Sequence, residues 1–320
     1  MGIRNEISRR YTLRDWYVSH KVRKLIGRLS ADLVISEVIN KGDPALVGRL
    51  GGTEGRFIGE YLKMRRYLKF GIPIPAVARF NYRWRKRCRE VQFNAGFIFH
   101  DWNEIENFVN LYQECLENTD ALGAWGTAFG WAESLAFTSK NFPEVIPIGH
   151  TAPWIAPANP DVAQIPWSAA LEGKKVLVIA GFAESIKNQH LKSKVLFDNC
   201  HYPDFSLSTI QAPLSAGGSP NPESDWFSDL TTMEKTMEKI DFDIALVSAG
   251  AYSYPLALKA KKMGKIGIHC GGGLQLFFGI MGGRWETNPS VCSYSNEHWV
   301  RPSLAETPVN SNQVEDGCYW

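Results

Sequence analysis

Two glutamates occupy positions from which a carboxylate could act as a base or hold a divalent cation. Glu54 closes the segment RLGGTE and Glu184 lies in GFAES, each just after an apolar run that ends in glycine. A carboxylate at the start of a helix can deprotonate a hydroxyl or ligate Mg²⁺ or Mn²⁺. The alternative is that each glutamate only favours the positive end of its helix. That alternative is the commoner case for one glutamate, whereas two carboxylates at one sheet edge favour chemistry.

Cations, glycines and polar side chains near these glutamates suit an anionic ligand. Arg49 can bind a phosphate through two N–H groups, and glycine turns let the backbone approach it. His269 either contacts a phosphate or is a core histidine, and Tyr252 either stacks on a base or covers its turn. The residues that we expect to bind a nucleotide-containing ligand are Arg49, Gly51, Gly52, Thr53, Asn94, Gly181, Ser185, Gly250, Ala251, Tyr252, His269, Gly271, Gly272 and Arg284.

Five apolar segments must position these residues, and each is predicted to be a strand that runs into a glycine turn. They are residues 45–50, 121–125, 175–180, 244–249 and 265–269, with turns at 51–54, 126–127, 181–184, 250–252 and 271–273. Helix-length segments such as 56–67 and 256–263 follow. This repeat predicts a Rossmann-like α/β fold with a mostly parallel sheet and helices on both faces. Ligands bind beyond the carboxyl ends of such strands, so the turns should gather at one edge.

The chain divides into three parts by composition. Residues 1–44 form a basic segment of helical periodicity, residues 45–285 a Rossmann-like core, and residues 286–320 an irregular tail. We expect the tail to pack on the core, because Trp299 and Trp320 would be costly to leave in water. The Gly-, Pro- and Ser-rich loop 212–225 is either a flap beside the site or a connector.

Composition and missing motifs exclude several classes of protein. The 320 residues are 44% hydrophobic and 21% charged, with no run apolar enough to cross a bilayer and no signal-peptide core at the start. Six cysteines lack the spacing of a zinc site or a disulfide framework, which favours a reduced, cytoplasmic setting. The motifs GxGxxG, GxxxxGK[ST], GxSxG and HExxH do not occur, so nicotinamide, P-loop, esterase and zinc-hydrolase readings lack support.

The net charge of +2 hides a strong asymmetry. Residues 1–90 contain 21 Lys and Arg against 8 Asp and Glu, a balance of +13, whereas the remainder has 14 against 25. The cations cluster in residues 9–28 and 63–89, where Tyr67, Phe70, Phe80, Tyr82 and Trp84 are interleaved with them. This mixture predicts either a solvated helix face or peripheral contact with an anionic membrane on its inner side. No nucleic-acid motif accompanies the charge, so we expect no nucleic-acid partner.

Several segments of the chain resemble those of a known family. RLGGTE after a short strand is similar to the RFGDGE-like signature of the GT-D glycosyltransferases. The segments VLVIAGFAESIKNQ, DFDIALVSAGAYSYPLALKAKKMGK, IHCGGGLQLFFGIMGGRW and EHWVRPSLAETPVNSNQVEDGCYW resemble a bacterial branch of this family found among surface-polysaccharide genes. The resemblance covers roughly residues 45–320.

The resemblance implies a glycosyltransferase that uses a nucleotide sugar, with a UDP-sugar as the favoured donor and a glycan or lipid-linked acceptor. It also implies Mn²⁺ or Mg²⁺ held by an Asp-x-Glu, of which this chain keeps Glu54 but has Gly52 in place of the Asp. Either Glu184 supplies the second carboxylate, or Arg49 and Arg284 neutralise the diphosphate without metal. A second departure is Ala180-Gly181, where relatives carry His-Pro. The base is Glu54 or Glu184, and both inversion and retention stay open.

Two other functions fit the same residues. The lost Asp is also compatible with a non-catalytic partner that binds a nucleotide or glycan. The fold is also compatible with another α/β transferase that acts on phosphorylated sugars.

Overall fold

The computed structural model describes residues 31–74, 78, 81–124, 144–153, 165–198, 201–217 and 225–320. The basic cluster 9–28, the predicted turn 126–127 and the middle of the loop 212–225 lie outside these residues. No helix in the described ranges has the length and apolar character that crossing a membrane requires.

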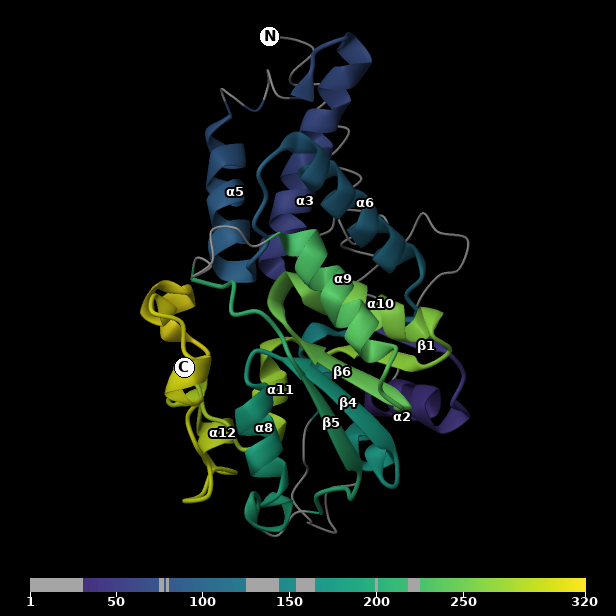
Figure 1. Ribbon diagram of the computed structural model, residues 1–320, viewed down its shortest axis with the longest axis vertical. Coiled ribbons are helices and arrows are strands. Elements are labelled where there is room, and N and C mark those ends of the chain that lie inside the picture. Colours follow the sequence, from purple (N-terminus) through teal and green to yellow (C-terminus); the bar gives the residue numbers. More distant parts are fainter. Residues whose placement is uncertain are drawn as a thin grey trace.

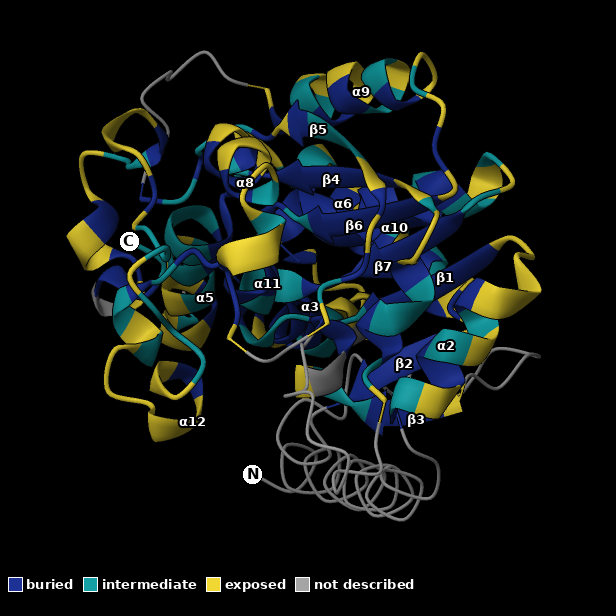
Figure 2. Cartoon of the chain, turned by 90° about the horizontal axis from the view of Figure 1, so that it is seen from below, coloured by how far each residue is buried: buried dark blue, intermediate teal, exposed yellow. Residues whose placement is uncertain are grey.

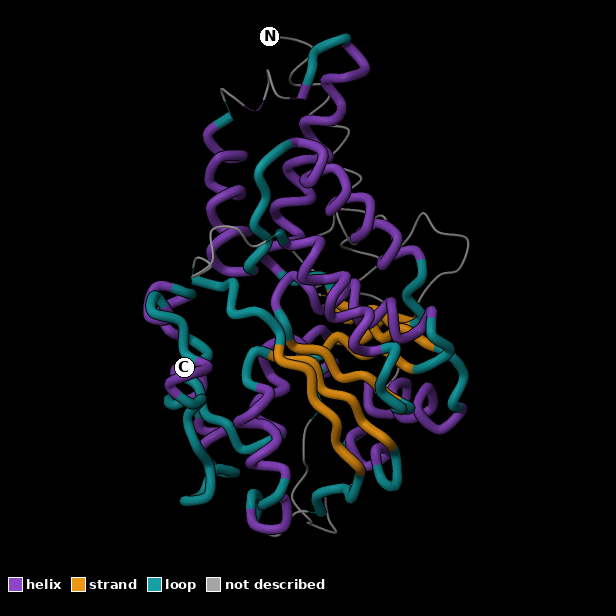
Figure 3. Tube along the Cα trace, in the orientation of Figure 1, coloured by secondary structure: helices purple, strands orange, loops and turns teal. Residues whose placement is uncertain are grey.

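The centre of the fold is a seven-stranded sheet in which every neighbouring pair of strands is parallel. The strand order is β3-β2-β1-β7-β6-β4-β5, so the first strand pairs with the last (Figures 1 and 3). The predicted α/β fold with a parallel sheet is therefore confirmed. The strands are β1 (Ala45–Arg49), β2 (Ala121–Ala124), β3 (Glu144–Pro147), β4 (Lys175–Ala180), β5 (Ser206–Gln211), β6 (Ile244–Ser248) and β7 (Ile266–His269).

Helices connect the strands and cover both faces of the sheet, as parallel strands require. Side chains alternate between the faces: Leu177 and Ile179 of β4 belong to one apolar cluster, whereas Val176 and Val178 belong to the other. All four are buried, as are most strand residues (Figure 2). The α-helices are α2 (Ala31–Lys41), α3 (Gly52–Arg65), α5 (Tyr82–Ala95), α6 (Trp102–Glu117), α8 (Ala183–His190), α9 (Trp226–Met237), α10 (Ser253–Lys262), α11 (Leu274–Phe277) and α12 (Pro289–Cys292).

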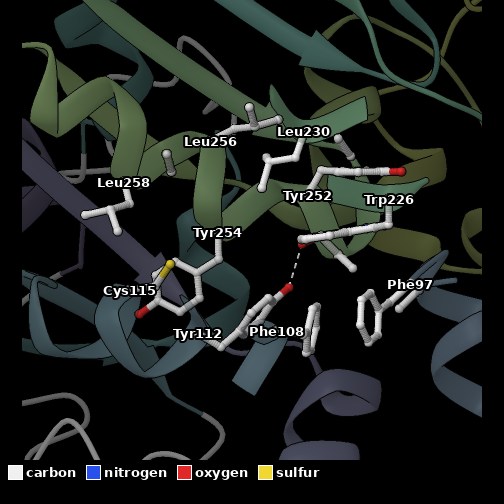
Figure 4. Close-up of a cluster of buried hydrophobic side chains, with 14 of the residues drawn as sticks. Phe97, Phe108, Tyr112, Cys115, Trp226, Leu230, Tyr252, Tyr254, Leu256 and Leu258 are labelled. Atoms are coloured by element: carbon white, nitrogen blue, oxygen red, sulfur yellow. Dashed lines mark hydrogen bonds between the residues drawn. The ribbon is translucent and has the colours of Figure 1, made fainter. Parts of the chain in front are cut away.

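Aromatic rings tie the helices of one face together. Phe97 stacks on Phe108 at 3.9 Å between ring centroids, and Trp226 stacks on Tyr252 at 4.8 Å. The hydroxyl of Tyr112 donates a hydrogen bond to the backbone oxygen of Ala251 (Figure 4). These contacts hold α6, α9 and the turn after β6 in a fixed arrangement.

Helices α3, α5 and α6 project from the sheet as a helical lobe (Figures 1 and 3). Helix α5 begins at Asn81, whose side chain accepts from the backbone N–H of Trp84, and ends at Gly96 in the left-handed conformation. The ring of Trp84 is buried and stacks on Phe57 and Trp102. Trp84 is therefore core, and the surface aromatic cluster expected from the sequence does not include it.

Candidate functional site

A cavity of about 460 Å³ lies beyond the carboxyl ends of four parallel strands, where the fold favours a ligand. Four of the five predicted turns contribute to it, those after β1, β4, β6 and β7. The fifth turn lies outside the described residues. Of the predicted nucleotide-binding residues, those that line the cavity are Arg49, Gly51, Gly52, Thr53, Asn94, Gly181, Gly250, His269, Gly271, Gly272 and Arg284, together with Glu54.

Arg49 ends β1 and its guanidinium is anchored on one side. Nη1 donates to the backbone oxygens of Ile148 and Cys270 and to the hydroxyl of Thr151, each at 3.3 Å. Nε is buried and has no hydrogen-bond partner. A Cβ at Gly271 would lie 2.7 Å from Cζ of Arg49, so a larger residue there would have to displace the guanidinium. Arg49 thus keeps a cationic donor unused within the protein, and such a donor suits a phosphate.

Glu54 lies in the first turn of α3 and is only 7% exposed. Its carboxylate folds back over Gly51, where a Cβ would come within 2.1 Å of Oε2. Burial raises the pKa of Glu54, while the charge of Arg49 opposes that shift and the charge of Glu315 adds to it. The protonated form of the carboxyl is therefore favoured more than it is in water.

His269 and Gln275 present two further unused polar atoms at the cavity. Nδ1 of His269 and Oε1 of Gln275 are buried without a hydrogen-bond partner, and both residues line the cavity. Burial lowers the pKa of His269 well below its usual value, and the charge of Arg49 adds to this shift. His269 is therefore a neutral imidazole near pH 7. Buried polar groups are normally paired, so these two atoms and Nε of Arg49 are hydrogen-bonding groups beside the cavity that the protein itself leaves without a partner.

The C-terminal tail closes one side of the cavity. From the sequence we expected this tail to pack on the core, but we expected no site residue in it. Glu315 forms an ion pair with Arg284, whose guanidinium also lies 5.0 Å from the ring centre of Tyr319. Glu315 adopts a φ of 45°, which non-glycine residues rarely do. Tyr319 and Trp320 also line the cavity, and a Cβ at Gly272 would lie 2.2 Å from Tyr319.

The helical lobe and the turn after β6 complete the wall. Asn94 and Ala95 bring the last turn of α5 to the cavity. Gly250 has a φ of 54°, and a Cβ there would lie 2.6 Å from the backbone oxygen of Ala95. The hydroxyl of Ser253 accepts from the backbone N–H of Ala249 at 2.7 Å. The described start of the loop 212–225 also reaches the cavity, through residues 213–216.

Four predicted site residues lie away from the cavity lining. Glu184 is exposed on α8, and its carboxylate accepts from Asn188 at 3.4 Å. Ser185 is buried beside Glu306, to which both its backbone N–H and its hydroxyl donate. Ala251 and Tyr252 belong to the aromatic core, where the ring of Tyr252 stacks on Trp226 rather than facing the cavity.

The donor set does not fit a divalent cation. Within the described ranges, no group of three or more His, Cys, Asp and Glu side chains lies close enough to hold a metal ion. Glu54 is instead accompanied by Arg49, and Glu315 is paired with Arg284. A hard cation prefers several oxygen ligands, and two guanidinium groups would repel it.

Comparison with known families supports one assignment. The family model of the GT-D fold-like domain matches residues 220–277, which include α9, β6, α10 and β7. No curated protein and no solved structure matches the chain. The matched segment supplies Gly250, His269 and Gly271 to the cavity. The sequence resemblance to the GT-D family is thus confirmed over residues 220–277, which form a GT-D fold-like, glycosyltransferase-related segment.

Proposed function

We propose that the protein is a glycosyltransferase that binds the diphosphate of a nucleotide-activated sugar in this cavity. The observation that carries the proposal is the set of three buried polar atoms without partners, Nε of Arg49, Nδ1 of His269 and Oε1 of Gln275, on residues that line one cavity. An anionic oxygen can accept from Arg49, while the neutral imidazole and the amide oxygen can meet donors on the ligand.

In this proposal, cationic side chains and glycine turns bind the diphosphate. Arg49 and Arg284 both line the cavity and can neutralise the charge that develops on a departing nucleoside diphosphate. Gly271 and Gly272 have no side chains, so their backbone can lie close to the phosphate. Because the carboxylates present do not fit Mn²⁺ or Mg²⁺, the charge is neutralised by side chains.

Two carboxylates of the cavity differ in environment, which suits two roles. Burial raises the pKa of Glu54, and in this proposal its carboxyl donates a hydrogen bond to the ligand. Glu315 pairs with Arg284 and serves as the base. The acceptor hydroxyl attacks the anomeric carbon, its proton passes to Glu315, and the bond from that carbon to the diphosphate oxygen breaks, with the electron pair leaving on the diphosphate. Glu184 lies outside the cavity lining, so the proposal gives it no part.

The donor and acceptor follow from the family resemblance. A UDP-sugar is the favoured donor, and a glycan or lipid-linked saccharide of a surface polysaccharide is the favoured acceptor. A cavity of about 460 Å³ is of the size that ligand pockets usually have.

The test is a thermal-shift series with UDP, GDP, CDP and CMP, each with Mn²⁺ and with EDTA. A ligand that binds only the folded state stabilises it by about 2.7 kcal/mol at a hundredfold excess over its Kd. We expect a shift with one diphosphate, of equal size with Mn²⁺ and EDTA, and its loss in Arg49→Lys. No shift with any of the four would contradict the proposal.

Binding without transfer is the second candidate, because Gly52 replaces the Asp of the family signature. Incubation with the matching nucleotide sugar separates the two functions. Release of the nucleoside diphosphate by the wild type, reduced at least tenfold in Glu315→Gln, supports transfer. A thermal shift without release supports the binding protein.

A further inference from the structure

Helix α3 runs away from the sheet, and the chain that follows it lies at the far end of the helical lobe (Figure 1). The short 3₁₀ helix η1 (Arg66–Phe70) follows α3 there. Leu68 is 48% exposed, Phe70 58% and Ile72 42%. We call these three residues the apolar tip. Large apolar side chains gathered on a surface mark an interaction site.

One tyrosine and three cationic side chains form a row along α5, which begins at the same end of the lobe. Tyr82, Arg85, Lys86 and Arg89 are spaced i, i+3, i+4 and i+7, so they share one face of the helix. All four are exposed and line a groove of about 410 Å³, together with Glu90. We call these four residues the basic stripe.

The cations of this region outnumber the glutamates that pair with them, Glu60 and Glu90. Residues 63–89 contain ten Lys and Arg and no Asp or Glu. Among the described residues, neither Arg85 nor Arg89 forms an ion pair, and Lys86 lies 3.9 Å from Glu90. The excess of cations produces a positive field on this part of the lobe, and a positive field together with exposed apolar side chains complements an anionic surface with an apolar interior.

We propose that the apolar tip and the basic stripe form a docking surface for an anionic lipid bilayer. Apolar side chains enter the headgroup boundary, while lysines and arginines are attracted by anionic lipids. A nucleic acid would use the cations and Tyr82, but it offers no apolar medium for Leu68, Phe70 and Ile72. The lipid surface is therefore the partner that both features fit.

The docking surface and the cavity lie at opposite ends of one helix. Tyr82 begins α5, and Asn94 near its end lines the cavity. Fourteen helical residues span about 20 Å at about 1.5 Å per residue. The basic stripe therefore begins about 20 Å from the cavity, measured along this helix. The docking proposal does not depend on which ligand the cavity binds.

The test is co-sedimentation of the full chain with vesicles of phosphatidylglycerol and phosphatidylethanolamine at low salt, compared with pure phosphatidylcholine. The charge variant is Arg85→Glu, Lys86→Glu and Arg89→Glu. Each cation near an anionic surface contributes about fivefold, so we expect binding to weaken by on the order of 100-fold. The matched control reverses the same number of charges on exposed lysines elsewhere, Lys187→Glu, Lys192→Glu and Lys194→Glu, and should bind as the wild type does.

A second variant, Leu68→Ser with Phe70→Ser and Ile72→Ser, tests the apolar tip. We expect it to lose the residual binding that the wild type keeps at 0.5 M salt, where electrostatic attraction is screened. All substituted side chains are exposed, and circular dichroism of each variant verifies folding.

Four results would overturn the proposal. These are no pelleting of the wild type with anionic vesicles, equal pelleting with phosphatidylcholine, equal weakening in the charge variant and its control, and unchanged binding of the apolar-tip variant. Binding of single-stranded RNA is measured in parallel. If the charge variant binds RNA more weakly than the wild type but binds vesicles equally well, the surface is instead a nucleic-acid surface.

Discussion

The carboxylate of Glu306 accepts hydrogen bonds from both the backbone N–H and the hydroxyl of Ser185. It also accepts from the backbone N–H of Glu184 at 2.9 Å and from the hydroxyl of Ser303 at 2.8 Å. A carboxylate from the tail thus occupies the positive end of α8. The anion site that the sequence placed at this helix is filled from within the chain, which leaves Arg49 and its surroundings for a ligand.

Replacing Glu306 by Gln should destabilise the protein by about 1–3 kcal/mol. The positive end of α8 loses the negative charge that balances it, and one buried hydrogen-bond donor loses its acceptor. Urea unfolding measures the change. Glu297→Gln is the matched control, since the side chain of Glu297 is 84% exposed. Equal unfolding midpoints for the two variants would show that the Glu306 contacts add nothing to stability.

Arg49→Lys should lower the affinity for a nucleoside diphosphate by about 10- to 100-fold, because lysine keeps the charge but loses the forked donor. Isothermal titration measures the Kd. Arg85→Lys, on the exposed face of α5, is the control and should leave the Kd unchanged. An unaltered Kd in Arg49→Lys would place the diphosphate elsewhere.

The free energy of unfolding should depend on pH through Glu54. Burial raises the pKa of this carboxyl above its ordinary value of 4.5, so the folded state binds the proton more tightly than the unfolded state does. The resulting stabilisation is present below pH 4.5 and is lost as pH rises through the folded-state pKa. Glu54→Gln should therefore gain stability relative to the wild type as pH rises from 4.5 to 8.

Urea unfolding at several pH values in this window measures that difference. Glu297→Gln serves again as the control and should follow the wild type at every pH. A constant difference between Glu54→Gln and the wild type would mean that the folded protein does not shift the pKa of Glu54.

Gly271→Ala should cost more stability than Gly264→Ala. Both glycines have positive φ, of 63° and 79°, so alanine is strained in each by about 1 kcal/mol. Only at Gly271 does the added Cβ meet another group, the guanidinium of Arg49 at 2.7 Å. We expect Gly271→Ala also to lose diphosphate binding, while Gly264→Ala retains it. Equal loss of stability with intact binding would show that Arg49 moves aside freely.

Glu315→Asn should raise the affinity for a nucleoside diphosphate several-fold, because Arg284 no longer faces a competing carboxylate. Asparagine tolerates positive φ, and an exposed ion pair contributes only about 0–1 kcal/mol, so the fold should be kept. Titration measures the Kd. Glu286→Gln, which breaks the ion pair with Arg301, is the control. Weaker binding in Glu315→Asn would show that Glu315 helps to hold the ligand.

The central strands could be predicted from the sequence because their apolar runs end in glycine. The predicted strand 175–180 coincides with β4, and 45–50, 244–249 and 265–269 each differ from β1, β6 and β7 by one residue. Strands β3 and β5 were missed. β5 has the sequence SLSTIQ, and four of its six residues carry hydroxyl or amide side chains, because an edge strand needs little apolar surface.

The cavity could be predicted only where strand ends supply it. Arg49, Glu54 and His269 follow strands, so the rule for parallel sheets finds them. Glu315 and Tyr319 reach the cavity through a tail of short 3₁₀ turns that has no periodicity to read. Glu184 shares the sequence pattern of Glu54, yet it faces solvent because the rotation of its helix is fixed by packing.

The pairing of β1 with β7 also has a consequence for synthesis on the ribosome. Register joins Val47 to Ile268, so one edge of β1 gains its neighbour only after more than 200 further residues have been made. At about 5–20 residues per second, that wait lasts on the order of 10–45 s. During this time β1 presents an unpaired apolar edge, which is open to association with other chains. Chaperone demand in the cell should therefore fall sharply once the segment that contains β7 has left the exit tunnel.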